Sequence, residues 1–202
     1  PDGVKSSMFF NYYRRWSKKV NPVMHMNHKV GDKMFIDYAG KTLEIVDEKT
    51  GEIIEVQFFV AILGASQYTY AEASMSQKKE DFIASVENAL HYFKGVPKAI
   101  VPDNLKSAVT KSSKYEPTVN ETFLDFSEHY GTTILPARAY RPRDKSLAEG
   151  AVKILYQRIY PKLSNQTFYS LRELNQAIWY QLEQHNNNRK LTGRPISRLA
   201  LF

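Results

Sequence analysis

The chain has 202 residues, of which 43% are hydrophobic and 24% charged, which is typical of one globular domain with a sizeable core and excludes a disordered chain. Cysteine is absent, which excludes disulfides and thiolate metal sites, and no apolar run approaches the ~20 residues that a membrane-spanning helix needs. The formal net charge of +7 favours a polyanionic partner, most simply nucleic acid.

Residues 7–20 predict an amphipathic helix in which aromatic side chains recur at helical spacing between arginines and lysines. We interpret it as a helix docked on the domain, and a basic face lying along DNA is the alternative. Asn21 and Pro22 end the helix. Residues 1–29 are therefore predicted to form an N-terminal helix and a linker.

From residue 33 the pattern changes to strands, which are joined by tight turns and so predict an antiparallel meander. The apolar runs are predicted over residues 34–39, 42–46, 53–63 and 68–73, with 53–63 as the second or third strand, and we count three sequential antiparallel strands among them. One carboxylate, Asp37, lies inside the first of these apolar runs. An ionised Asp is costly there unless a cation meets it, so Asp37 either caps a turn at the strand end or binds a metal together with other carboxylates.

The spacing of the apolar residues then becomes helical and predicts a helix over residues 76–94, which Ser76 caps. A short strand over residues 98–101 follows and leads to Asp103, after which a Ser/Lys-rich stretch is interpreted as a mobile loop. The remaining predicted elements are a helix over 120–130, a strand over 132–135, a basic loop over 136–145, a helix from 144 or 146 to 163, and a final helix that Ser170 caps. We assign residues 30–165 to a core domain and residues 166–202 to its C-terminal helical extension.

This order predicts an α/β fold with a mixed five-stranded sheet, three antiparallel strands first and parallel βα units after, flanked by helices. In such a sheet the first strand is central and the fourth lies parallel beside it. Asp37 and Asp103 then come from adjacent strands, and Glu149, in the first turn of the next-to-last helix, can reach the same edge. Each acid also has an ordinary explanation, Asp103 as a turn residue and Glu149 as an acid favoured near a helix N-terminus.

Three carboxylates at one edge of a sheet suit Mg²⁺, which takes hard oxygen ligands and keeps several waters. Two such ions ~4 Å apart can activate the attacking oxygen and stabilise the leaving oxygen of a phosphodiester. Cationic side chains flank the predicted site and are candidates to hold a phosphate backbone, although the loop among them can equally be a solvated one. These candidates are Lys106, Arg138, Arg141, Arg143, Lys145 and Lys153.

Three stretches carry a family resemblance: Phe-Ile-Asp37-Tyr-Ala-Gly, Gly-Val-Pro-Lys-Ala-Ile-Val-Pro-Asp103-Asn-Leu-Lys-Ser-Ala-Val and Asp144-Lys-Ser-Leu-Ala-Glu149-Gly-Ala-Val. They resemble the integrase-type catalytic core of DDE transposases, and within it the IstA-type transposases of bacterial insertion sequences. Tyr70-Ala-Glu-Ala73 supports the resemblance, which covers residues 12–202.

The resemblance implies an RNase H-like fold, with Asp37, Asp103 and Glu149 as the catalytic, metal-binding triad. It implies Mg²⁺ as cofactor, with Mn²⁺ as a substitute and two ions per site when DNA is bound. The implied reaction is 3′-end cleavage of transposon DNA and strand transfer into target DNA. The implied partners are transposon-end DNA, target DNA, an AAA+ helper ATPase and further copies of the chain in a homo-oligomeric DNA complex, at the nucleoid in the bacterial cytoplasm and not at a membrane.

IstA-type proteins also carry an N-terminal helix-turn-helix region and a small C-terminal β domain. Neither is recognisable in this chain, which starts at Pro1 without Met, so we interpret it as an excised core. Two other functions remain open. A plain RNase H-like nuclease or resolvase would cut DNA without joining it, and a non-catalytic basic DNA-binding module would bind neither Mg²⁺ nor Mn²⁺.

Overall fold

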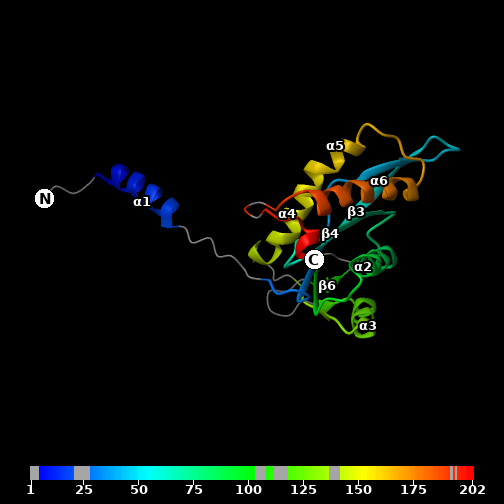
Figure 1. Cartoon of the computed structure of the whole chain (residues 1–202), viewed down its shortest axis with the longest axis horizontal. Helices are drawn as coiled ribbons and strands as arrows, with labels where there is room; N and C mark the ends of the chain where they lie inside the picture. The colour runs from blue at the N-terminus through cyan, green and yellow to red at the C-terminus, as the bar shows by residue number, and fades with distance from the viewer. Residues whose placement is uncertain are drawn as a thin grey trace.

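A six-stranded mixed sheet forms the centre of the computed structural model (Figure 1). The structure describes residues 5–20, 28–102, 108–111, 118–136, 142–191, 193 and 195–202. Five strands follow the order β2-β3-β1-β5-β8, and β4 pairs with the other edge of β3. The strands are β1 (Lys33–Tyr38), β2 (Leu43–Val46), β3 (Ile53–Leu63), β4 (Thr69–Ser74), β5 (Ala99–Pro102) and β8 (Thr133–Ile134).

The long strand β3 explains why the sheet has six strands where the sequence predicts five. Its first residues pair with β2, in the register Leu43↔Val56, and its last residues pair with β1, in the register Met34↔Leu63. β1 and β2 thus occupy one edge of β3 in succession, separated at residues 39–42, while β4 occupies the other. The mixed α/β fold class is confirmed. Strands β1, β2 and β4 each pair antiparallel with β3, whereas β5 pairs in parallel with β1 and β8 in parallel with β5.

Helices cover both faces of this sheet. They are α2 (Lys79–Phe93), α3 (Glu121–Tyr130), α4 (Pro142–Arg158), α5 (Tyr160–Leu163), α6 (Leu171–Glu183), the π-helical turn η1 (Gln184–Asn188) and the short η2 (Leu199–Leu201). Phe58 and Phe59 are adjacent in β3, so their side chains point to opposite faces, and both are fully buried. Phe59 packs against Phe82 of α2, whereas Phe58 packs against Tyr160 of α5. The helix pair α4–α5 and helix α2 therefore lie on opposite faces.

One of the two predicted helix caps is confirmed. The side chain of Ser170 accepts a backbone N–H group at the start of α6, and Asn120, which was not predicted as a cap, does the same at the start of α3. The prediction for Ser76 is wrong, because α2 begins only at Lys79 and has no side-chain cap. Ser76 Oγ instead donates to Asp81 Oδ2 at 2.5 Å, which ties the preceding turn to the first turn of the helix.

Part of the Ser/Lys-rich stretch that the sequence predicts as a mobile loop forms a small antiparallel sheet. Its strands are β6 (Val109–Lys111) and β7 (Thr118–Val119). Residues 103–107 and 112–117 lie outside the described part of the chain. The predicted helix up to residue 163 is divided into α4 and α5 at Ile159, and α4 begins at Pro142, where a proline is well tolerated.

Helix α1 (Ser6–Val20) forms as predicted, but the interpretation that it docks on the domain is wrong for this single chain. Its six large apolar side chains are all 51–60% exposed, and Figure 1 shows the helix apart from the sheet. These side chains are Met8, Phe9, Phe10, Tyr12, Tyr13 and Trp16. Within the described residues, no helix has the length and apolar character needed to span a membrane.

The outer edge of β4 is sealed by polar side chains from the C-terminal helices rather than by another strand. An edge strand presents unpaired N–H and C=O groups, which must find partners when they are buried. Here the side-chain amide of Asn175 in α6 accepts from the N–H of Ala73 at 2.6 Å and donates to its C=O at 3.0 Å. The amide of Asn186 in η1 does the same for Thr69, at 3.2 and 2.7 Å. Between them, the indole of Trp179 donates to the C=O of Ala71 at 3.1 Å. Residues 171–186 are thereby integrated into the sheet domain.

Candidate active site

Asp37 lies in the central strand β1, between the antiparallel neighbour β3 and the parallel neighbour β5. Its neighbours in the strand, Ile36 and Tyr38, are buried, while Asp37 itself is only partly buried. The backbone N–H of Tyr38 donates to Asp37 Oδ1 at 2.8 Å. A carboxylate in this position is held by a rigid strand and restrained by the hydrogen bond that it accepts from the next residue's N–H, while solvent access keeps its desolvation cost low.

Strand β5 brings the next predicted acid to the same end of the sheet. It pairs in parallel with β1, and its last residue, Pro102, is in register with Ile36, the residue before Asp37. Asp103 follows Pro102 directly in the sequence but lies outside the described residues. The predicted parallel pairing of the strand that carries Asp37 with the strand that leads to Asp103 is therefore confirmed, whereas the meeting of Asp37 with Asp103 stays a prediction.

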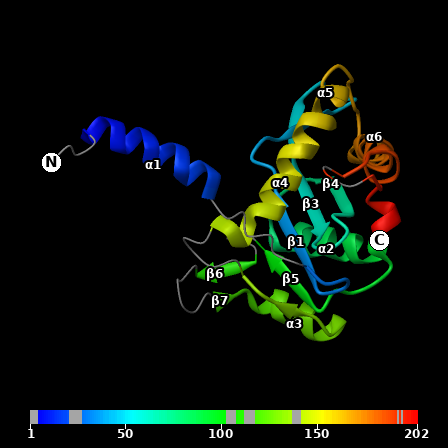
Figure 2. The ribbon, with the colours of Figure 1, turned by 60° about the vertical axis from the view of Figure 1, so that its left-hand side comes forward.

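Glu149 lies on α4, which packs against β1 and β3 on one face of the sheet (Figure 2). The buried side of this helix is formed by small and aliphatic residues that include Ala148, Ala151 and Leu155. Glu149 is exposed beside them. The helix thus places this carboxylate in solvent, on an element that crosses the strand carrying Asp37.

The carboxylates of Asp37 and Glu149 are ligands of the kind that a hard divalent cation prefers. Asp37 and Glu149 supply carboxylate oxygens with solvent access, as Mg²⁺ requires when it keeps part of its water shell. Among the described residues, no three His, Asp or Glu side chains gather closely enough to hold a metal ion. Asp103 lies outside those residues, so the three-carboxylate site remains a prediction.

Most of the predicted DNA-binding side chains fall where the structure gives no side-chain position. Lys106, Arg138 and Arg141 lie outside the described residues, and the side chains of Arg143 and Lys145, in the first turns of α4, are not described either. Lys153 is described: it is exposed on α4, one helical turn after Glu149. Their contribution to DNA binding stays a prediction.

No protein-family model matches the chain. A putative transposase of Sinorhizobium fredii is 46% identical over 202 residues, which is 100% of this chain and 39% of the relative. The putative transposase for insertion sequence IS1162 of Pseudomonas fluorescens is 41% identical over 189 residues, or 93% of this chain and 34% of the relative. The chain is homologous to part of the insertion-sequence transposases. It spans about two fifths of the length of two putative transposases of Sinorhizobium fredii that it matches along its whole length.

Solved structures show the same fold in retroviral integrases. The catalytic core domain of HTLV-2 integrase in complex with magnesium has a TM-score of 0.61 at 13% identity, covering 88% of this chain and 99% of that domain. The catalytic core domain of BIV integrase has a TM-score of 0.59 at 12% identity, covering 85% of this chain and 93% of that domain. This transposase-related core is therefore RNase H-like.

Glu72 is a carboxylate to which the sequence assigns no separate role, although it lies within the stretch Tyr70-Ala-Glu-Ala73 that supports the family resemblance. Glu72 is buried on β4, where Tyr70 Oη donates to it at 2.5 Å and Asn88 Nδ2 donates at 3.2 Å. Burial, followed by the charge of Glu72, raises the pKa of Tyr70, so the phenol remains a donor. The structure thus explains Glu72 as a buried acid with dedicated donors.

Tyr70→Phe is expected to lower the free energy of unfolding by about 1.5–3 kcal/mol, because it removes a hydrogen bond to a buried carboxylate. Chemical denaturation monitored by circular dichroism measures the change. Tyr180→Phe, at a side chain that is 62% exposed, is the matched control and is expected to shift it by less than about 0.5 kcal/mol. Equal effects of the two substitutions would contradict the role of Tyr70 as the donor to Glu72.

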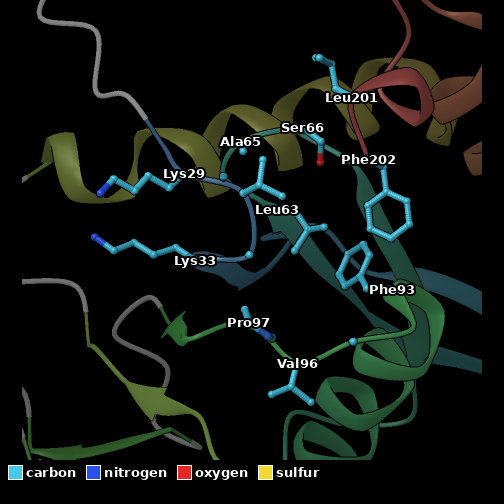
Figure 3. Close-up of a pocket in the computed structure, with 14 residues that line it drawn as sticks. Lys29, Lys33, Leu63, Ala65, Ser66, Phe93, Val96, Pro97, Leu201 and Phe202 are labelled. Carbon is cyan, nitrogen blue, oxygen red and sulfur yellow. The ribbon is translucent and has the colours of Figure 1, made fainter.

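An apolar pocket lies at the opposite end of β1 from Asp37. Figure 3 shows Phe93 and Phe202 facing each other at one end of it, with Lys29 and Lys33 extending from the other. Lys33 starts β1, four residues before Asp37, which is about 13 Å along an extended strand. Among the described residues, no Asp or Glu side chain lines this pocket, and neither Asp37 nor Glu149 belongs to it.

Proposed function

We propose that the chain is the catalytic core of a DNA transposase that cleaves the 3′ ends of transposon DNA and transfers them into target DNA. Its 46% identity to a putative transposase along the whole chain and its integrase-core fold support this proposal. The observation that carries it is the parallel pairing of β1 with β5. This pairing places the residue before Asp37 in register with the residue before Asp103, at the same end of two adjacent strands. Paired carboxylates at such a position suit the metal ions that phosphodiester chemistry uses.

In this proposal Asp37, Asp103 and Glu149 hold Mg²⁺, with two ions per site when DNA is bound. When bound, the ions supply activation of the attacking oxygen and stabilisation of the leaving oxygen. Asp37 provides a fixed ligand from the centre of the sheet, since the Tyr38 N–H restrains its carboxylate. Glu149 provides a ligand from a separate element, helix α4. The HTLV-2 integrase core was solved in complex with magnesium, which supports the choice of metal.

The proposed partners are transposon-end DNA, target DNA, an AAA+ helper ATPase and further copies of the chain. The net charge of +7 supports a nucleic-acid partner, and Lys153 near Glu149 is placed to contact a phosphate backbone together with the basic loop before α4. The HTLV-2 integrase core has been solved in dimeric and trimeric forms, which supports self-association. The boundaries at residues 30 and 165 remain part of the proposal.

Addition of MnCl₂ is expected to raise the melting temperature of the native chain by a few degrees, because the ions bind only the folded carboxylate cluster and relieve its mutual repulsion. Differential scanning fluorimetry measures the shift. Asp37→Asn is expected to remove most of it. Asp125→Asn, on the exposed face of α3, is the control and is expected to keep it. A shift of the same size in Asp37→Asn and in the native chain would contradict Asp37 as a ligand.

A further inference from the structure

A second pocket lies between helix α4, the turn that joins β3 to β4, and the C-terminal segment. The wall from α4 is apolar and includes Leu147, Ala151 and Ile154. The C-terminal segment contributes His185 of η1 and Arg198, the residue before η2. Neither Asp37 nor Glu149 lines this pocket, so it is a different place from the candidate metal site.

Arg198 is an unusual side chain to find here, because two of its three guanidinium nitrogens are buried without partners. The residue is only 4% exposed, and within the described part of the chain its Nε and Nη1 atoms have no hydrogen-bond partner. Burial, and then the charges of Arg158 and Arg189, lower the pKa of Arg198 to about 10. The group therefore stays charged at neutral pH, and a buried unpaired charge is strongly destabilising until an anion meets it.

The groups around Arg198 are donors and cations. Arg158 Nη1 lies 3.0 Å from Nδ1 of His185. Since a guanidinium can only donate, Nδ1 accepts and the ring proton is on Nε2. Burial first, and then the charges of three arginines, lower the pKa of His185 to about 3, so the imidazole is neutral. Among the residues that the structure describes, neither Arg158 nor Arg198 forms an ion pair with a carboxylate.

We propose that this pocket binds a single phosphate group, with Arg198 Nε–H and Nη1–H as its principal donors and His185 Nε2–H as a further donor. The guanidinium is suited to tetrahedral oxyanions because its N–H groups are fixed in one plane and stay charged. Arg158 and the exposed Arg189 add positive charge around the site. Three clustered guanidinium groups are better compensated by a phosphate than by a single carboxylate, which favours phosphate as the ligand.

The test compares thermal unfolding of the whole chain in sodium phosphate, sodium acetate and sodium chloride at equal ionic strength and pH. Native protein is expected to melt about 5 °C higher in saturating phosphate, because the ligand binds only the folded state. Arg198→Met is expected to lose this rise. In phosphate-free buffer it is expected to melt at or above the native temperature, because it removes a buried unpaired charge. Arg172→Met, at an exposed site on α6, is expected to keep the full rise.

Three results overturn the proposal: no phosphate-specific rise in the native chain, an equal rise in Arg198→Met, or an acetate rise as large as the phosphate rise. If Arg198→Met fails to fold, the native chain still decides the question. The Arg198 Nε–H resonance is expected to shift on titration with phosphate and not with chloride, and an unmoved resonance rejects the site.

A competition experiment identifies the source of the phosphate. If the ligand is a DNA phosphate, a short oligothymidylate is expected to displace inorganic phosphate and to bind Arg198→Met more weakly than it binds the native chain. If the ligand is free phosphate, oligothymidylate affinity is expected to be the same for both proteins, with the thermal shift still dependent on Arg198. Either result retains the phosphate site. It also leaves the proposed transposase function untouched, because that function rests on Asp37, Asp103 and Glu149.

Discussion

Asp37→Asn is expected to reduce strand transfer at least about a hundredfold while leaving DNA binding within about twofold. Even residues that only orient a metal ligand change activity about 10–100-fold, so loss of a ligand itself has a larger effect. The substitution changes one oxygen to an amide nitrogen and preserves the shape of a side chain in the rigid strand β1. Joining of a labelled transposon end to target DNA, with Mg²⁺, measures the change. Asp103→Asn and Glu149→Gln are expected to behave in the same way.

Asp125→Asn on α3 is the matched control and is expected to join DNA at the native rate, because this acid is exposed on a helix that is not part of the candidate site. Full joining by Asp37→Asn or Asp103→Asn refutes the assignment of the triad. Cutting without joining by the native protein, in the presence of both DNA partners, favours a plain RNase H-like nuclease instead.

Asn175→Leu is expected to have the largest effect on stability among single substitutions outside the apolar core. It is expected to lower the free energy of unfolding by about 2–6 kcal/mol, because it leaves both the N–H and the C=O of Ala73 without partners in a buried place, at a cost of about 1–3 kcal/mol for each group. Urea denaturation followed by tryptophan fluorescence or circular dichroism measures the loss.

Gln176→Leu is the control for this substitution, since Gln176 is the next residue of α6 and is exposed. It is expected to change the free energy of unfolding by less than about 0.5 kcal/mol. If Asn175→Leu is no more destabilising than Gln176→Leu, then α6 does not seal the edge of β4 in solution, and another segment must satisfy the backbone groups of that edge.

Local patterns predicted the central elements well because short-range chemistry determines them. Strand β3 was predicted at the bounds that the structure has, Ile53–Leu63, since its long apolar run is followed by Gly64. Ser170 was recognised as a cap because a cap depends only on the next few residues. Ser76 failed as a cap because the sequence alone does not determine how many residues separate a turn from the first helical hydrogen bond, and α2 begins at Lys79.

Features that depend on distant residues could not be predicted from the sequence. The bonds from Asn175 and Asn186 to β4 join residues 102 and 117 positions apart. The cluster of Arg158, His185 and Arg198 likewise arises only when α4, η1 and the C-terminal segment meet, and its members show no recognisable spacing. The interpretation that α1 docks on the domain was wrong because an amphipathic pattern predicts that a helix has an apolar face but not which surface covers that face.

The candidate site was predictable in part. The sequence predicted that β1 is central and parallel to the strand that leads to Asp103, and the register of Ile36 with Pro102 confirms that pairing. It could not predict how exposed Glu149 is, since this depends on which side of α4 packs on the sheet. The meeting of the three carboxylates remains the central claim of the proposed function.

The most direct test of that claim is a crystal structure of the chain soaked in MnCl₂, with anomalous diffraction to locate the ion. The expected result is a manganese peak at about 2.0–2.3 Å from carboxylate oxygens of Asp37 and Asp103, with Glu149 bound directly or through a water molecule. A well-ordered site without manganese, or with Glu149 held away from both aspartates in every copy, would contradict the metal-dependent mechanism.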